Sequence, residues 1–172
     1  MKTNIKTNLF FVCSILLIFS SCTKEPGCMD PNSMTYNSEA KKDDGSCVYA
    51  YDIAQGTWNI TPDCDEIDIL GQTLSLDDQL PESIEVQGAI DNSLFIDIDG
   101  TQVSGNIDNM GNITVDPQTV QVDPGLGFTL DVEIDGDGNV SLDNTGNMNL
   151  KYSFEIPVVG SYSVDCSVEL SK

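Results

Sequence analysis

From residue 51 onward, apolar and polar residues alternate with a period of two. Such alternation is typical of β-strands that bury one face and expose the other to solvent. The pattern therefore predicts a series of antiparallel strands with one shared apolar face. Its clearest segments are 84–87, 128–134, 148–156 and 162–170, and shorter ones occur at 94–98, 103–107, 113–115, 120–122 and 140–142.

Turn-forming residues separate these segments at regular intervals, as expected for strands that follow one another in hairpins. The turn signals are Asp91-Asn92, Asp99-Gly100, 109–112, 135–139 and 144–146. Two stretches break the rhythm. Residues 70–81 predict a longer loop with room for a helical turn, and residues 116–127, which contain Pro117 and Pro124, predict a bend or an interruption in a strand.

The sheet must cover its own apolar face, because the chain has almost no helical pattern with which to cover it. It can close into a small barrel, or it can pack as a β-sandwich. Cys166 lies on the apolar side of the last predicted strand, and Cys64 shares the parity of Trp58 in the first. A bond between these cysteines would place the first strand beside the last. We therefore expect an all-β fold, an antiparallel meander that closes into a barrel, with the sandwich as the alternative.

The N-terminal segment has a different pattern. Lys2 and Lys6 precede an apolar run over residues 9–19, which is short of the roughly 20 residues that a bilayer core requires. A charged start, a short apolar centre and small residues after it are typical of a secretory signal. The stretch Phe19-Ser20-Ser21-Cys22 resembles a lipobox, the cleavage motif of bacterial lipoproteins.

This resemblance implies that residues 1–21 are a signal peptide and that the Cys22 thiolate accepts the lipid. Two or three acyl chains at one residue anchor a protein durably, whereas one chain holds it only marginally. Thr23 follows Cys22, rather than the Asp that retains some lipoproteins at the inner membrane. We therefore expect a protein tethered by its lipid to the outer membrane or the cell surface.

Four of the six cysteines then remain, because Cys13 leaves with the signal and Cys22 carries the lipid. Four cysteines in an oxidising compartment allow three pairings. Local organisation favours Cys28–Cys47 and Cys64–Cys166. The mature chain then divides into an anchor with a disulfide module, residues 22–50, and a β-barrel domain, residues 51–172.

Residues 27–49 resemble a short module of surface proteins from Gram-negative bacteria, with the pattern Cys-x-Asp-Pro followed by Asp-Asp-Gly-Ser-Cys-x-Tyr. The biochemical role of that family is not established, so the resemblance implies location rather than mechanism. A segment this short cannot bury a core of its own and needs a disulfide or a metal. Its oxygen-bearing side chains either form turns or bind Ca²⁺, the one candidate cofactor. They are Asp30, Asn32, Asn37, Asp43 and Asp44.

Gly56-Thr57-Trp58, at the head of the first predicted strand, resembles the Gly-x-Trp start of lipocalin-like domains, including those of bacterial lipoproteins. The resemblance covers residues 51–172 in outline and implies a lipocalin-like β-barrel. It also implies that a basic residue packs over the tryptophan. The chain contains no Arg, so Lys151 or Lys172 would take that place.

The chain is strongly acidic, with 28 Asp and Glu residues, 7 lysines, no His and a formal charge of −21. This charge excludes nucleic acid as a partner, because it repels phosphate. An imidazole base and a His-ligated metal are both excluded, and the cysteines are better explained as disulfides than as nucleophiles. The carboxylates are too numerous for their spacing to select a catalytic pair. We therefore expect no enzymatic activity.

Two functions remain. The first is a structural or interaction module of the cell envelope, which contacts a protein partner through its acidic outer face or its disulfide module. The second is a lipocalin-like binder of a small apolar ligand inside the barrel. In that case residues 70–81 could form a lid, and Gly88 and Gly105 could leave interior space or mark bends.

Overall fold

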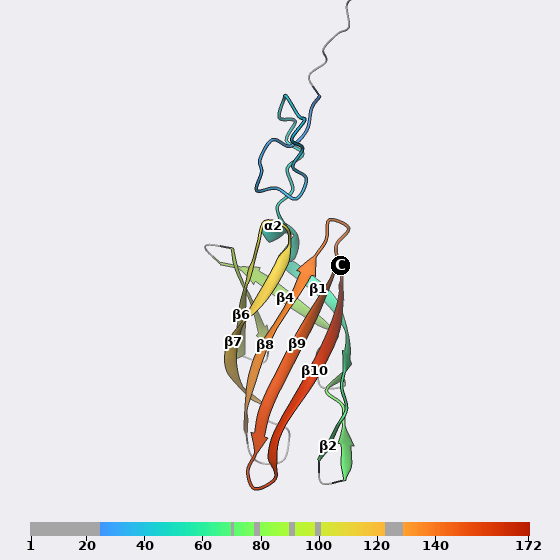
Figure 1. Ribbon diagram of the computed structural model, residues 1–172, viewed down its shortest axis with the longest axis vertical. Coiled ribbons are helices and arrows are strands. Elements are labelled where there is room, and N and C mark those ends of the chain that lie inside the picture. The colour runs from blue at the N-terminus through green and yellow to red at the C-terminus, as the bar shows by residue number, and fades with distance from the viewer. Residues whose placement is uncertain (1–24, 70, 78–79, 90–91, 99–100, 123–128) are drawn as a thin grey trace, which may run out of the picture.

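The computed structural model describes residues 25–172 except 70, 78–79, 90–91, 99–100 and 123–128. The predicted signal peptide and the lipid site at Cys22 lie outside the described residues. From top to bottom, Figure 1 shows a small N-terminal module, a short helix and a barrel.

Eight antiparallel strands form a closed barrel, which confirms the predicted all-β meander and rules out the sandwich. Around the barrel the order is β1-β10-β9-β8-β7-β6-β5-β4, so the first strand lies beside the last. A small hairpin, β2 (Ile67–Ile69) with β3 (Gln72–Leu74), forms a separate sheet outside the barrel. Its first strand precedes the loop predicted at 70–81, and its second strand lies inside that loop. The barrel strands are β1 (Gly56–Cys64), β4 (Ser83–Gly88), β5 (Ser93–Ile98), β6 (Thr101–Ile107), β7 (Asn112–Val122), β8 (Leu130–Val140), β9 (Thr145–Ile156) and β10 (Gly160–Ser171).

Both predicted disulfides are confirmed. Cys28–Cys47 closes the N-terminal module. Cys64 and Cys166 lie directly opposite each other in the β1–β10 ladder, with their Cα atoms 4.0 Å apart. The alternating pattern put both cysteines on the apolar side of their strands, and that prediction is correct. Both are almost fully buried.

The predicted hairpin turn at 135–139 is wrong, because β8 runs straight through it to Val140. Gly136 and Gly138 have extended backbones and lie where β9 approaches β8 closely. A Cβ at Gly136 would come within 2.2 Å of the Asn149 carbonyl oxygen, and one at Gly138 within 2.3 Å of the Met148 sulfur. These glycines make room for β9 rather than a turn. The turn comes later, where Asn144 has a φ of 62°.

The predicted bend at 116–127 is confirmed over its described part, and residues 123–128 lie outside the described residues. The register between β7 and β8 shifts between Val115 and Gln118, which is a β-bulge. The β6–β7 ladder stops at Gly105 and Val115. Beyond it the Gln118 side chain donates to the Ser104 carbonyl at 2.9 Å and accepts from the Ser104 amide at 3.1 Å. This side-chain amide gives the Ser104 backbone the donor and the acceptor that a continued ladder would have supplied.

Side chains fill the interior of the barrel in its upper half. A Cβ at Gly88 would clash with Tyr51 and Gln55, so these residues already occupy the space that the glycine leaves. At Gly105 the β7 backbone approaches instead, and the Thr114 carbonyl oxygen would lie 2.6 Å from a Cβ at this position. The upper core comprises Ala50, Ile53, Ala54, Trp58, Leu94, Ile107, Val140, Val168 and Leu170.

The lower half of the barrel contains two further apolar clusters that share Leu150, Tyr152 and Phe154. One surrounds the Cys64–Cys166 disulfide and is covered by Ile67, Leu76 and Leu80. The segment that was predicted as a loop and possible lid thus packs, in its described part, against the apolar interior. Asp77 of this segment also accepts a hydrogen bond of 2.8 Å from the Cys64 amide, so it covers the free edge of β1.

Helix α2 (Ala50–Ala54) closes the upper end of the barrel over Trp58. Trp58 is only 1% exposed, and its indole N–H donates to the Ala54 carbonyl at 2.8 Å. The Lys172 ammonium lies 4.7 Å from the centroid of the Trp58 ring and donates to the carbonyls of Ile53 and Gln55. Of the two lysines proposed from the sequence, Lys172 therefore packs over the tryptophan, whereas Lys151 lies on the outer face of β9.

We predict that Lys172→Ala destabilises the protein by about 1–2 kcal/mol, because it removes a cation–π contact and two charged hydrogen bonds to the end of α2. Chemical denaturation would measure this change. Lys41→Ala is the matched control, since it removes the same charge from an exposed position of the N-terminal module, and we expect its effect to stay within about 0.5 kcal/mol. Equal effects of the two variants would contradict the role of Lys172.

Candidate functional site

The outer face of β8, β9, β10 and β1 is built from the polar residues of each alternating strand. The register places Asp135 opposite Lys151, and Lys151 opposite Asp165. One pleat farther along, Asp137 lies opposite Asn149, and Ser167 lies opposite Asp63. Antiparallel pairing thus brings acids that are distant in sequence into two adjacent rows.

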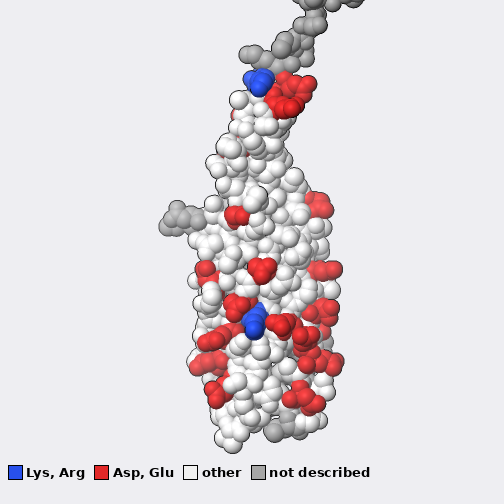
Figure 2. All heavy atoms as spheres, in the orientation of Figure 1, with Lys and Arg blue, Asp and Glu red and all other residues white. Residues whose placement is uncertain are grey.

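These rows line a hollow of about 490 Å³, which we call the acidic groove. In Figure 2 the acidic side chains gather around one lysine on the face formed by these strands. Lys151 is the single basic residue of the lining, and the structure describes no ion pair or hydrogen bond between its ammonium and the aspartates around it. The groove lining is Asp63, Asp65, Asp135, Gly136, Asp137, Asn149, Leu150, Lys151, Asp165, Cys166 and Ser167.

Five aspartates around one lysine give the groove a strong negative potential. Like charges on neighbouring strands repel one another, and a bound cationic group would relieve that repulsion. Among the described residues, no group of three or more Cys, Asp or Glu side chains is arranged to hold a metal ion. Ammonium and guanidinium groups donate charge-assisted hydrogen bonds to carboxylates, and the separate aspartates of the groove offer several such acceptors.

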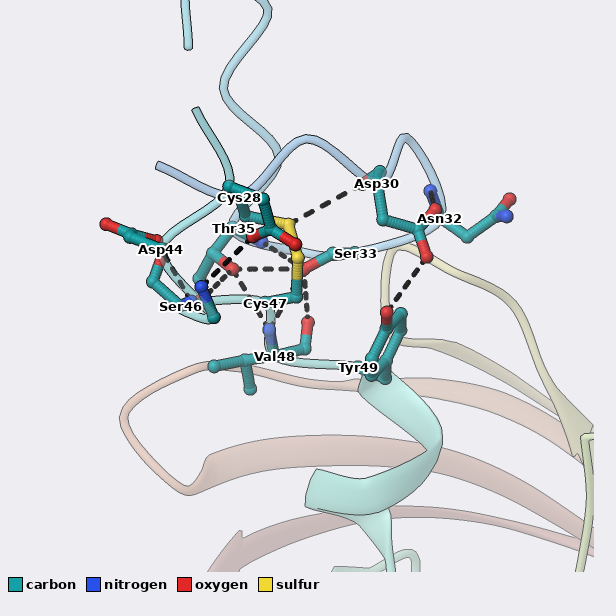
Figure 3. Close-up of a disulfide and its surroundings, with 12 residues drawn as sticks. Cys28, Asp30, Asn32, Ser33, Thr35, Asp44, Ser46, Cys47, Val48 and Tyr49 are labelled. Carbon is teal, nitrogen blue, oxygen red and sulfur yellow. Dashed lines mark hydrogen bonds between the residues drawn. A yellow bond between two sulfur atoms is a disulfide. The ribbon is translucent and has the colours of Figure 1, made fainter. Parts of the chain in front are cut away.

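The N-terminal module is held together by its disulfide and by buried hydroxyl groups (Figure 3). Ser33 is 6% exposed, and its hydroxyl donates to the Val48 carbonyl at 2.8 Å and accepts from the Val48 amide at 3.0 Å. Thr35 donates to the Ser46 carbonyl at 2.8 Å. These bonds join the two cysteine-bearing ends of the module, so polar contacts replace the core that a segment of this length cannot form.

The five predicted oxygen donors of this module are all engaged by the protein itself. Four of them accept a backbone N–H two residues ahead, as in Asx turns. The side chain of the first residue accepts from the backbone N–H of the second in these pairs: Asp30 with Asn32, Asn37 with Glu39, Asp43 with Gly45, and Asp44 with Ser46. Asn32 accepts instead from the side chain of Asn109 in the β6–β7 turn. Four of the five side chains therefore stabilise turns, and the fifth contacts the barrel.

Two of these aspartates have lowered pKa values because their carboxylates accept hydrogen bonds. The Asn32 backbone N–H and the Tyr49 hydroxyl lower the pKa of Asp30 from its ordinary value of 3.8. The same carboxylate raises the pKa of Tyr49. The side chain of Ser46, and after it the Ser46 backbone N–H, lowers the pKa of Asp44.

The module also contacts the top of the barrel. Met34 packs against the upper core, and its methyl group would lie 3.2 Å from a Cβ at Gly111 in the β6–β7 turn. The Asn109–Asn32 bond of 2.9 Å joins the same turn to the module. A second hollow of about 420 Å³ lies at this junction and is lined by Met34, Met110, Asn112, Asn139, Val140, Ser141 and Leu142.

The alternation over 148–156 and 162–170 places Lys151 and Asp165 on the polar side of their strands, but it does not predict their assembly into a groove. The alternating pattern shows which face a residue occupies, whereas the groove depends on the register between strands. That register required the β8 strand to continue through 135–139, where the sequence predicted a turn.

Comparisons of the chain with protein-family models, with curated proteins and with solved structures found no match. None of the described helices has the length and the apolar character needed to cross a membrane.

We predict that Tyr49→Phe raises the pKa of Asp30 toward 3.8 without reaching it, because the Asn32 N–H still donates to the carboxylate. A depressed folded pKa means that the Asp30 contribution to stability is present above the unfolded pKa, near 3.9. It is lost as the pH falls below 3.8 through the lowered folded value. An NMR titration of the Asp30 carboxyl would measure this folded-state pKa in the unchanged protein and in the variant. Tyr36→Phe, which alters an exposed module tyrosine, should leave the titration unchanged, and a shift of similar size there would contradict the assignment.

Proposed function

We propose that the chain is a lipid-anchored, non-enzymatic lipoprotein of the outer membrane or cell surface that acts as an interaction module. Its acidic groove contacts a cationic surface of an envelope protein. The observation that carries this function is the acidic groove itself, five aspartates and one lysine on the outer face of a barrel whose interior is packed.

The sequence supports the anchor. The Phe19-Ser20-Ser21-Cys22 stretch resembles a lipobox, and the described module begins only three residues after Cys22. A compact disulfide module, rather than a long flexible linker, would therefore separate the lipid from the barrel. Because the module also contacts the barrel through Asn32 and Met34, the barrel would be presented to its surroundings in a restricted orientation.

The packing supports contact through the outer surface in preference to the alternative of an apolar ligand inside the barrel. Tyr51 and Gln55 fill the space beside Gly88, and α2 lies over Trp58 at the upper end. In the lower half, Leu76 and Leu80 pack onto the apolar cluster around the disulfide. The two hollows described above, of about 490 and 420 Å³, lie on the outside of the barrel.

The composition supports a non-enzymatic role. The chain has no His, and its four described cysteines form disulfides, so it lacks an imidazole base and a described free thiol. The groove carboxylates come from exposed positions, where they face solvent. They are better suited to binding a cation than to transferring a proton.

We predict that Cys22→Ser abolishes lipid modification and releases the mature protein from membranes. Metabolic labelling with a fatty-acid analogue, followed by membrane fractionation, would test this, because the thiolate is the only nucleophile that the lipidation chemistry uses. Cys13→Ser is the matched control and should keep both the label and the membrane association. Persistence of label in the Cys22→Ser variant would contradict the anchor.

We predict that the combined change of Asp135, Asp137 and Asp165 to Asn weakens partner binding at least tenfold, because it removes three of the five groove carboxylates. A photo-crosslinking residue at Asn149 in the full chain, expressed in its own cells, would identify the partner, and the purified pair would then give the dissociation constant. Changing Glu25, Glu39 and Glu82 to Gln is the control with the same net charge change.

The groove assignment fails if crosslinking yields no protein adduct, or if the control set weakens binding as much as the groove set. A defined apolar molecule found by mass spectrometry in the purified protein would instead favour the ligand-binding alternative.

A further inference from the structure

The turn between β9 and β10 contains an unusual residue at its centre. The Val159 amide donates to the Ile156 carbonyl at 3.0 Å, which closes a four-residue β-turn with Pro157 and Val158 in its middle positions. Val158 has a φ of 72°. Turns with positive φ at this position ordinarily use Gly or Asn there, because a Cβ crowds the backbone.

Val158 breaks a rule that the chain otherwise follows. Every other described residue with positive φ is Gly or Asn, for example Asn92, Gly111 and Asn144. A β-branched residue is the least suited to this conformation, and its side chain contributes no packing in compensation, since Val158 is 108% exposed. Val159 beside it is 38% exposed. The turn therefore carries two apolar side chains in solvent at a conformational cost.

The hairpin that carries this turn is regularly paired up to its last residues. Gly160 pairs with Ile156, Ser161 with Glu155 and Tyr162 with Phe154, without a bulge. The Phe154 and Tyr162 rings stack at a centroid distance of 5.7 Å. Strained residues persist where the surrounding structure holds them, and such residues are concentrated at sites of ligand or partner contact.

The turn lies at the end of the barrel opposite the N-terminal module (Figure 1). We propose that Val158 and Val159, the distal tip, insert into an apolar pocket of the protein partner. This inference rests on the proposed function and names a second contact of the same interaction, at the point farthest from the anchored end.

The net charge of the chain and the small apolar area of the tip favour a protein pocket, rather than a membrane or a second copy of the chain, as the binding partner of the tip. A chain with a formal charge of −21 is repelled by anionic lipid surfaces and by a second copy of itself. Two valines without an adjacent basic or aromatic anchor are a small apolar surface for membrane insertion. A preformed pocket can enclose them fully, and basic residues at its rim would complement Glu155 and, farther along the hairpin, Asp165.

The tip is tested with Val158→Asn, since Asn tolerates a positive φ and removes only the apolar contact. We expect an unchanged or higher melting temperature and at least a tenfold weaker affinity for the partner identified by crosslinking. Leu142→Asn is the matched control, because Leu142 is also an exposed apolar turn residue, 49% exposed, but lies at the opposite end of the barrel. It should leave the affinity unchanged.

A photo-crosslinking residue at position 158 in the full chain, in membranes of its own cells, locates the contact directly. A protein adduct at 158 that matches the partner found from Asn149 supports the tip. An adduct from Asn149 alone, lipid adducts at 158, or an unchanged affinity of Val158→Asn overturns the tip and leaves the proposed function standing. The absence of protein adducts from both positions overturns both.

Discussion

Closure of the barrel depends on β1, which must pair with a strand on each side although neither ladder covers its whole length. Residues 59–64 pair with β10, and residues 56–59 pair with β4. The Cys64–Cys166 disulfide holds the β10 side, where the paired residues are 102 positions apart in the chain. A covalent link across so long a separation removes much of the entropic cost of bringing the ends together. Trp58 holds the other half of the strand under α2.

Side chains continue the barrel at the points where its ladders stop. Gln118 replaces a peptide group between β6 and β7, and Asp77 accepts the Cys64 amide at the free edge of β1. These three bonds satisfy backbone groups that would otherwise be left without a partner or would attract another chain. The barrel is thus closed by backbone ladders, by one disulfide, and by two side chains, the Gln118 amide and the Asp77 carboxylate, that bond to the backbone where a ladder stops. This explains how a barrel containing a bulge and an external hairpin keeps a packed interior.

The sequence predicted the fold well because its strongest signals are local and periodic. Parity alone placed Cys64 and Cys166 on the same face, and a bond between them placed the first strand beside the last, which favoured the barrel over the sandwich. The error at Gly136 and Gly138 has a physical reason, because glycine permits both positive φ and close backbone approach, and the sequence does not distinguish the two uses. The groove was missed for a related reason. It depends on which residue of β9 lies opposite which residue of β8 and β10, and a single displaced turn changes every such pairing.

Glycine and asparagine stand in this chain where the backbone imposes a constraint. Where a backbone comes close, as at Gly105 and Gly136, the sequence removes the side chain, and where a turn needs positive φ, as at Asn144, it supplies a tolerant residue. These choices make each local preference agree with the fold. An exposed valine at positive φ is therefore informative, because a sequence that satisfies this constraint elsewhere departs from it where the side chain meets solvent. Stability does not account for that residue, whereas a contact made at this end of the barrel would.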